Sequence, residues 1–291
     1  MKLISKFSTT RNLLKNNKKN VLNDLKKHKK SKDQFETILF LPKIASRKGE
    51  GGLRTHDYFK ISNNQNPLIT IITVVYNNER YIEETILSVL NQSYDNLEYL
   101  IIDGGSTDKT VDIIKKYDNS IDYWVSEKDD GVYDAMNKGC KLSTGNGLCF
   151  LNSGDKFIGN VFKKKVKLPY LIPCKIKENK KNFWNKKLTD KTFGMPTSHQ
   201  AMVFLNKRLL YNLKYKISSD YDFFIRHGVF LNINLDNPGY VLYDNKGMSK
   251  KNFLLRDYET ILILYKYYGL YASIVFSITQ ILKFFKRLLG I

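Results

Sequence analysis

Residues 69–75 have the sequence ITIITVV, an uninterrupted run of apolar and β-branched side chains. A run of this kind, without polar alternation, is typical of a strand buried on both faces of a parallel sheet. Residues 79–90 follow with apolar side chains at helical spacing, and residues 97–102 (LEYLII) repeat the strand pattern. A strand, a helix and a second buried strand in this order predict a right-handed crossover between parallel strands.

The alternation of helix and strand continues to residue 151. The pattern predicts helices over residues 107–117 and 132–142 and strands over residues 121–125 and 147–151. We therefore expect an α/β fold with a Rossmann-like, mostly parallel sheet and helices on both faces.

The net charge and its distribution along the chain limit the possible functions and indicate the domain organisation. Its 291 residues contain 48 Lys and Arg against 28 Asp and Glu, a net charge of +20, which raises the alternatives of nucleic-acid or acidic-membrane binding. The net charges of successive segments are +11 for residues 1–60, −7 for 61–160, +9 for 161–191, +1 for 192–245 and +6 for 246–291. The best-patterned part is acidic, which argues against nucleic acid. We expect a basic N-terminal extension over residues 1–66, a central domain over 67–250 and a C-terminal helical segment over 251–291.

Cysteines and targeting signals give little functional information. Cys140, Cys149 and Cys174 form no C-x-x-C pair, and we expect reduced, buried thiols in a cytosolic protein. The Lys- and Asn-rich beginning of the chain does not have the pattern of a secretory signal, and no clean stretch of about 20 apolar residues predicts a membrane span.

Polar residues follow all four predicted strands, at Tyr76–Glu79, Asp103–Ser106, Ser126–Gly131 and Asn152–Asp155. Each group alone is typical of an ordinary turn. Together they lie where ligands bind in parallel sheets, beyond the carboxyl ends of the strands. Several carboxylates converging there would repel one another without a cation, which predicts a divalent metal with oxygen ligands. Because neither G-x-G-x-x-G nor a P-loop follows the first strand, a metal-bridged diphosphate is the expected ligand.

Four of these stretches resemble the nucleotide-sugar half of family 2 glycosyltransferases with the GT-A fold: ITIITVVYNNERYIEETILSVLNQSY, LEYLIIDGGSTDKT, SEKDDGVYDAMNKG and FLNSGD. The similarity is strongest to the bacterial capsule, colanic-acid and O-antigen type. It extends through PTSHQAMVF (196–204) and KISSDYDFFIR (216–226). It implies a nucleotide-sugar half over residues 67–160 and an acceptor half over residues 161–250.

The resemblance assigns donor-binding roles residue by residue. Tyr76, Asn77 and Glu79 would line the nucleoside pocket, Asp103 would hydrogen-bond the base, and Asp129 would lie near the ribose and sugar. The segment 152–155 takes the place of the D-x-D motif that holds Mg²⁺ or Mn²⁺. Asn152 and Gly154 stand where carboxylates are often found, so Asp155 is the expected anionic metal ligand.

The resemblance also assigns the reaction chemistry to the second half. Asp220 matches the general base that deprotonates the acceptor hydroxyl in a single displacement with inversion, and Asp222 is the alternative. Asp220 could instead be the N-cap of a helix over residues 221–227. His199 and Gln200 match the family's HQ pair and would touch the donor phosphates or the acceptor, although a buried core histidine is an equal alternative.

Three further segments carry expectations of their own. Arg54, in GGLRT (51–55), is expected to fold against the core and to face acceptor phosphates. The lysine-rich residues 161–191, with Phe183 and Trp184, lie where the fold places its acceptor region. An amphipathic pattern over residues 274–289, with Lys283, Lys286 and Arg287, predicts a helix that docks on an anionic membrane or packs on the core.

The resemblance implies a hexosyltransferase that moves a sugar from a nucleoside-diphosphate sugar to a glycan, with a polyprenyl-diphosphate lipid as the expected acceptor carrier. Its place would be capsule or lipopolysaccharide biosynthesis, peripheral on the cytoplasmic face of the cell membrane. A sugar nucleotidylyltransferase is an alternative, but it would need a Gly- and Arg-rich loop after the first strand. A basic nucleic-acid-binding protein is the alternative from another class.

Overall fold

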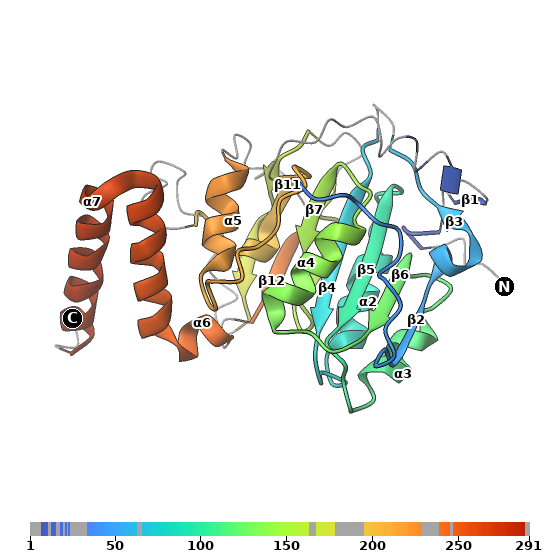
Figure 1. Cartoon of the computed structure of the whole chain (residues 1–291), viewed down its shortest axis with the longest axis horizontal. Coiled ribbons are helices and arrows are strands. Elements are labelled where there is room, and N and C mark those ends of the chain that lie inside the picture. Colours follow the sequence, from blue (N-terminus) through green and yellow to red (C-terminus); the bar gives the residue numbers. More distant parts are fainter. Residues whose placement is uncertain are drawn as a thin grey trace.

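A seven-stranded sheet forms the centre of the molecule in this computed structural model (Figure 1). The structure describes residues 7–10, 13–15, 18–19, 21, 23, 34–62, 66–162, 167–177, 195–228, 239–244 and 247–288. The strand order is β2-β6-β5-β4-β7-β11-β9. Phe183 and Trp184 lie outside the described residues.

The four inner strands are parallel, as the apolar runs predict. They are β4 (Ile69–Val75), β5 (Leu97–Asp103), β6 (Tyr123–Ser126) and β7 (Gly147–Phe150). All residues of the four strands are buried, because helices cover both faces of the sheet. The parallel sheet of the sequence prediction is confirmed.

Three antiparallel strands extend this parallel centre. β2 (Gly49–Gly51) pairs with β6 at one edge, while β11 (Met202–Leu205) pairs with β7 and with β9 (Tyr170–Leu171) at the other. The short pair β1 (Leu14–Lys15) and β3 (Tyr58–Phe59) lies outside the main sheet. Because β2 belongs to the main sheet, the basic segment before residue 67 differs from the rest in charge but shares its sheet.

Helices cover the sheet on both faces (Figure 1). On one face, α2 (Ile82–Leu90) and α3 (Thr110–Lys116) bury Ile82, Ile86 and Ile114 in a common core. On the other face, α4 (Val132–Leu142), α5 (Ser219–His227) and α7 (Phe253–Leu288) share a second core. A smaller sheet, in the order β10-β12-β8, comprises β10 (Cys174–Ile176), β12 (Tyr240–Tyr243) and β8 (Lys156–Ile158). The three cysteines are buried and free, as expected.

The C-terminal segment is a helical hairpin that follows the short α6 (Met248–Lys251). α7 consists of two helices that meet at Gly269, whose φ of 78° breaks the helix, and Figure 1 shows them running antiparallel. By length and composition, residues 253–282 could cross a membrane: an 18-residue window within them has a mean hydropathy of 1.5, and 28% of that window is buried. Ile263, Leu264 and Phe276 pack into the core, so both helices of the hairpin contact the protein.

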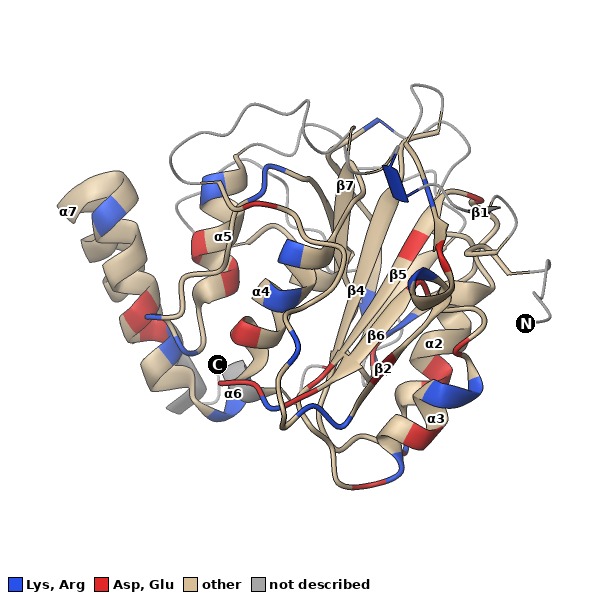
Figure 2. Cartoon of the chain, turned by 45° about the vertical axis from the view of Figure 1, so that its right-hand side comes forward, with Lys and Arg blue, Asp and Glu red and all other residues tan. Residues whose placement is uncertain are grey.

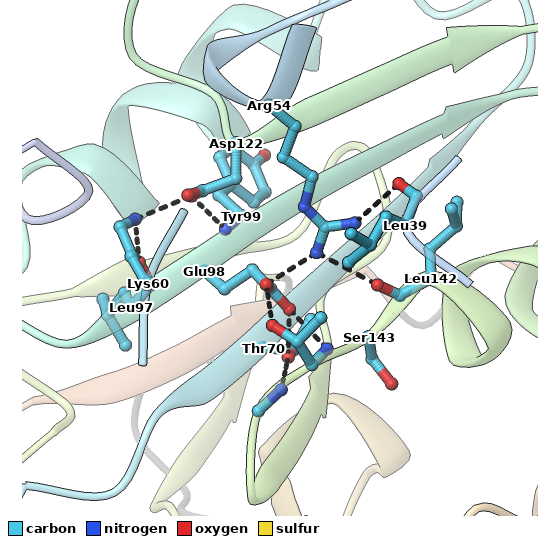
Figure 3. Close-up of polar contacts among 12 residues, drawn as sticks. Leu39, Arg54, Lys60, Thr70, Leu97, Glu98, Tyr99, Asp122, Leu142 and Ser143 are labelled. Carbon is cyan, nitrogen blue, oxygen red and sulfur yellow. Dashed lines mark hydrogen bonds and ion pairs between the residues drawn. The ribbon is translucent and has the colours of Figure 1, made fainter. Parts of the chain in front are cut away.

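A network of buried charges lies between the sheet and the N-terminal segment (Figure 3). Arg54 is 2% exposed and donates to Glu98 at 2.6 Å and to the carbonyl oxygens of Leu39 and Leu142. Lys60 forms a second buried pair with Asp122 at 2.8 Å. GGLRT does fold against the core, as expected, but the expectation that Arg54 faces acceptor phosphates is wrong. Its guanidinium points inward because the Glu98 carboxylate needs a buried counter-charge.

Candidate active site

A cavity of about 640 Å³ opens at the carboxyl ends of β4 and β7, beside the beginning of α5. This is the edge at which parallel sheets bind ligands. Five of the residues singled out in the sequence line it together: Asn152, Asp155, His199, Gln200 and Asp220. The other six, Tyr76, Asn77, Glu79, Asp103, Asp129 and Asp222, do not line this cavity.

Asp220 lies in the first turn of α5, where its carboxylate faces the cavity. Burial raises the pKa of this carboxyl to about 6, partly offset by a hydrogen bond from the backbone N–H of Tyr221. The N-cap residue is Ser218, so the alternative that Asp220 is the N-cap is not observed. A carboxylate with a pKa of about 6 in a cavity has the properties of a general base.

Asp222, the alternative base, points away from the cavity. Its side chain is fully buried and accepts hydrogen bonds from Arg226 Nε at 2.7 Å and from the hydroxyl of Tyr267 at 2.9 Å. Residues two apart on a helix face nearly opposite directions, so only one of the two aspartates can reach the cavity. The structure therefore contradicts Asp222 as a base and assigns it to the contact between α5 and α7.

Glu259 of α7 holds the segment that carries Asp220. Its carboxylate is 4% exposed and accepts the backbone N–H groups of Lys216, Ile217 and Ser218 at 2.6, 2.9 and 2.8 Å. These are donors just ahead of a helix, where a negative charge is favourable. Nothing in the sequence motifs pointed to Glu259, because it lies far from residue 218 along the chain.

Three oxygen-bearing side chains meet at the other end of the cavity. Asp155 is 5% exposed, and burial raises its pKa to about 7, although the backbone N–H of Asp244 donates to it at 2.9 Å. Asp244 lines the same cavity, and the amide oxygen Oδ1 of Asn152 is buried with no hydrogen-bond partner among the described residues.

Asn152, Asp155 and Asp244 can be compared with the ligands that the predicted divalent metal would need. Within the described ranges, no three His, Cys, Asp or Glu side chains gather as a complete ligand set. Two carboxylates and an unpartnered amide oxygen nevertheless fit a Mg²⁺ or Mn²⁺ ion that takes its remaining ligands from a diphosphate, since these ions prefer oxygen ligands.

His199 is part of an aromatic cluster at the floor of the cavity. Its ring stacks on Phe150 with centroids 4.9 Å apart, and its Nε2 lies 2.5 Å from the hydroxyl of Tyr211. Burial lowers the pKa of His199 to about 3, so the ring is neutral at physiological pH. This favours the core-histidine alternative and removes His199 as a cation for the phosphates. Gln200, beside it, hydrogen-bonds the Asp155 carboxylate and lowers its pKa.

The residues assigned to the nucleoside connect two loops above the sheet. The Asn77 side chain accepts the backbone N–H of Thr107 at 2.7 Å, and the Glu79 carboxylate accepts that of Lys109 at 2.8 Å. Tyr76 is 63% exposed beside them. Asn77 and Glu79 thus hold the β4–α2 and β5–α3 loops together. Contact of these residues with a nucleoside stays a prediction.

Asp103 and Asp129 differ in how far a ligand can reach them. Asp103 is fully buried, and its carboxylate accepts from the N–H groups of Gly105 and Ser106 and from the hydroxyls of Ser106 and Ser126. These contacts use its oxygens to shape the turn, which does not support the expected hydrogen bond to a base. Asp129 is half-buried against Gly104, and burial raises its pKa.

Four cations line the cavity that the sequence motifs missed: Lys177, Lys216, Lys250 and Arg256. They come from four separate segments, which no local spacing connects. For Lys177, Lys250 and Arg256 the sequence signal was the positive charge of residues 161–191 and 246–291, and Lys216 is the first residue of the KISSDYDFFIR motif, which gave it no role.

Comparisons with known proteins agree with this geometry. The sequence model described as "Glycosyl transferase family 2" matches residues 70–168. A PGL/p-HBAD biosynthesis glycosyltransferase of Mycobacterium bovis is 30% identical over 183 residues, which cover 55% of this chain and 69% of that protein. The Bacillus subtilis glycosyltransferase TuaG, named for teichuronic acid biosynthesis, is 37% identical over 114 residues, covering 38% and 45%. The chain spans only 36% to 45% of the first four curated relatives.

Solved structures agree at the level of the fold. The mannosyltransferase PcManGT of Pyrobaculum calidifontis, in complex with GDP-Man and Mn²⁺, has a TM-score of 0.51 and 16% identity, covering 70% of this chain and 64% of that chain. Residues 1–349 of S. aureus TarS, in complex with UDP-GlcNAc, have a TM-score of 0.50 and 16% identity, covering 68% and 66%. The fold is therefore the GT-A fold that the motifs predicted.

Proposed function

The chain belongs to glycosyl transferase family 2, and we propose that it transfers a hexose from a nucleoside-diphosphate sugar to a glycan acceptor carried on a polyprenyl-diphosphate lipid. The observation that carries this proposal is that Asp220 lines the same cavity as Asn152, Asp155 and Asp244. A base at one end and a diphosphate site at the other are what a direct glycosyl transfer requires.

The reaction we propose is one in-line displacement at the anomeric carbon. An acceptor hydroxyl gives its proton to Asp220 as its oxygen forms the new bond to that carbon. The bond between the carbon and the diphosphate oxygen breaks on the opposite side, and the electron pair leaves with the diphosphate. One displacement inverts the anomeric configuration. Burial supports Asp220 in this role, because a carboxylate with a raised pKa is a stronger base.

Asp155, Asp244 and the Asn152 amide oxygen would hold Mg²⁺ or Mn²⁺ in this proposal. When bound, the ion supplies positive charge that neutralises the diphosphate leaving group. The protein contributes Lys177 at the same end, since its Nζ donates to the carbonyl oxygen of Gly154 at 2.5 Å. PcManGT, which shares the fold, binds GDP-Man together with Mn²⁺, and this supports the proposal that a metal ion accompanies the donor here.

Replacing Asp155 with Ala should weaken the binding of a nucleoside diphosphate in the presence of Mn²⁺ by at least about tenfold. Even the outer-shell partners of protein-bound metals are worth this much. Isothermal titration calorimetry with UDP and GDP, each with Mn²⁺ and with EDTA, measures the effect. The matched control is Asp112→Ala, which removes an exposed carboxylate on α3. Equal affinities for wild type and Asp155→Ala would rule out the metal role.

We also propose that the C-terminal hairpin binds the anionic cytoplasmic face of the cell membrane. Among the described residues, thirteen of the eighteen large apolar side chains that are exposed lie on α7. We call these thirteen the apolar hairpin face: Phe253, Leu254, Leu255, Tyr258, Leu262, Tyr265, Leu270, Tyr271, Ile274, Ile278, Ile281, Leu282 and Phe285. An exposed apolar surface on this scale is typical of a membrane or protein contact.

Charge and shape favour a membrane as its occupant. Residues 246–291 carry a net charge of +6, which attracts anionic lipids. The first helix of the hairpin, residues 253–268, is about 24 Å long at 1.5 Å per residue, which is shorter than the hydrocarbon core of a bilayer of about 30 Å. The break at Gly269 and the buried residues of both helices therefore favour a hairpin lying on the bilayer surface over a span.

The double variant Ile274→Asp with Ile281→Asp should lower binding to anionic lipid vesicles by about tenfold or more. Each exposed isoleucine loses the free energy of burial in the bilayer, and each Asp adds repulsion. Flotation with phosphatidylglycerol-containing vesicles measures the partition. The control is Ile44→Asp with Leu213→Asp, two similarly exposed apolar residues outside the hairpin. Unchanged flotation would contradict the proposal. If the wild type is a dimer in solution and the double variant is a monomer, while vesicle binding is unchanged, the occupant of this face is a second copy of the chain.

A further inference from the structure

Three of the four cations that line the cavity come from the segment just before α5 and from the α6–α7 region that contacts it. Lys216 is the first residue of the segment held by Glu259, and the carbonyl oxygen of Arg256 accepts a hydrogen bond from the Ser218 hydroxyl at 3.0 Å. Lys250 lies on α6. The side chains of Lys216 and Lys250 are exposed and have no hydrogen-bond or ion-pair partner among the described residues. Arg256 is ion-paired with its neighbour Asp257 at 2.7 Å.

This group is distinct from the cation that serves the diphosphate end. Lys177 contacts Gly154 and lies over the ring of Tyr81, which places it beside Asp155. A donor diphosphate bound by Asp155 and Lys177 leaves Lys216 and Lys250 without an anion of their own, while Arg256 shares the charge of Asp257. Lysines that line a cavity without carboxylate partners are suited to a phosphate, and a guanidinium beside them can add a further donor.

The same cations border the apolar hairpin face. Phe253, Leu254 and Leu255 lie between Lys250 and Arg256 in the chain, and all three are exposed, Leu254 to 73%. In Figure 2 basic ribbon lies at α6 and at the beginning of α7, followed by acidic ribbon and then by mostly uncharged ribbon. A cationic, anion-binding site and an apolar surface thus meet at the edge of the cavity. A water-soluble glycan would use neither, whereas an amphiphile with a phosphate head would use both.

We propose that Lys216, Lys250 and Arg256 form an acceptor-phosphate subsite, which binds the diphosphate of a lipid-linked acceptor while its hydrocarbon chain lies along Phe253–Leu255. The inference rests on the proposed glycosyl transfer and specifies how the acceptor is recognised. Holding the diphosphate here fixes the first sugar of the acceptor near Asp220, so its hydroxyl is oriented before the reaction. The cations recognise a charge that every polyprenyl-diphosphate-linked acceptor shares, independently of its sugars.

Farnesyl diphosphate and farnesol are suitable probes, because they share a short isoprenoid chain and differ in the diphosphate. We expect the full-length protein, saturated with nucleoside diphosphate and Mn²⁺, to bind farnesyl diphosphate at least tenfold more tightly than farnesol. Lys250→Ala should weaken farnesyl diphosphate binding about tenfold, since a hydrogen bond to a charged group is worth roughly that factor. The matched control is Lys251→Ala, because Lys251 is the exposed neighbour of Lys250 on α6 and does not line the cavity. We expect it to change binding less than twofold.

Other outcomes would overturn the inference. Equal effects of Lys250→Ala and Lys251→Ala would show that farnesyl diphosphate is attracted by general surface charge and not by a specific subsite. Displacement of farnesyl diphosphate by the nucleoside diphosphate, or a loss of nucleotide affinity in Lys250→Ala, would assign these cations to the donor. If no nucleoside diphosphate binds at all, the proposed glycosyl transfer fails instead, and the comparison of the two lysine variants with farnesyl diphosphate alone still decides the subsite.

Discussion

Replacing Asp220 with Asn is expected to lower the turnover number of sugar transfer by roughly 10²- to 10⁴-fold, the usual contribution of a general base. The amide keeps the shape of the side chain but cannot accept the proton of the acceptor hydroxyl. Affinity for nucleoside diphosphate and Mn²⁺ should stay within about twofold of wild type, because in our proposal the donor binds beside Asp155 and not at Asp220. Single-turnover transfer and calorimetry separate the two quantities.

The pH dependence supplies a second test of the same residue. Burial raises the pKa of Asp220 to about 6. A base must be deprotonated to act, so with donor and Mn²⁺ saturating, wild-type kcat should be constant above this pH and fall about tenfold per unit below it. The residual rate of Asp220→Asn should lack this dependence between pH 5 and 7, a window set by the same raised pKa. A wild-type rate that stays constant down to pH 4, well below that value, would contradict the assignment.

Asp222→Asn is the matched control, two residues along the same helix. Asp222 is paired with Arg226 and Tyr267 and does not line the cavity. We therefore expect this variant to lose stability while the folded enzyme keeps a turnover number close to wild type. Exchanged results for the two variants would make Asp222 the base and Asp220 the structural residue.

Replacing Arg54 with Met should lower the free energy of unfolding by about 3–5 kcal/mol, the typical cost of leaving one member of a buried ion pair without its partner. Both side chains of the Arg54–Glu98 pair are nearly inaccessible, with 2% and 3% exposed. Burial alone would raise the pKa of Glu98, but Arg54 and the hydrogen bonds from Thr144 and Thr70 hold it below its usual value. Without the guanidinium, the carboxylate remains buried with only neutral donors. Urea denaturation measures the change.

Two comparisons identify the buried charge as the cause. The exposed pair of Lys115 and Asp112 provides the control, and Lys115→Met should change stability by less than about 1 kcal/mol. The double variant Arg54→Met with Glu98→Gln removes the uncompensated charge, so it should be more stable than Arg54→Met alone. A double variant that is less stable than the single one would show that lost packing, and not charge, dominates at this site.

The sequence predicted the centre of the fold because burial on both faces leaves a distinct pattern. β4 occupies Ile69–Val75, the run from which the prediction began, and α4 occupies the predicted residues 132–142. The beginnings of helices were less accurate. α2 begins at Ile82 instead of residue 79, because the chain first makes a turn in which the carbonyl oxygen of Asn78 accepts the N–H groups of Tyr81 and Ile82.

The candidate site was predictable only where its residues follow strands in sequence. Asn152 and Asp155 come directly after β7, and the topology places them in the cavity. Asp103 also ends a strand, yet the type of residue does not tell whether a carboxylate turns outward to a ligand or inward to its own loop. Helical spacing could have separated Asp220 from Asp222. Lys250 and Arg256 had no such signal, because tertiary packing alone brings α6 and α7 to the cavity.

The bond between Glu259 and the segment before α5 has a practical consequence for protein production. Removing an apolar C-terminal segment is a common way to obtain soluble enzyme, and residues 251–291 are the obvious piece to delete. Deletion here would leave the N–H groups of Lys216, Ile217 and Ser218 without their carboxylate acceptor, at about 1–3 kcal/mol for each group that stays buried. Solubility is better sought by making the outward side chains polar and keeping the helices, so that Glu259 continues to hold the segment that carries Asp220.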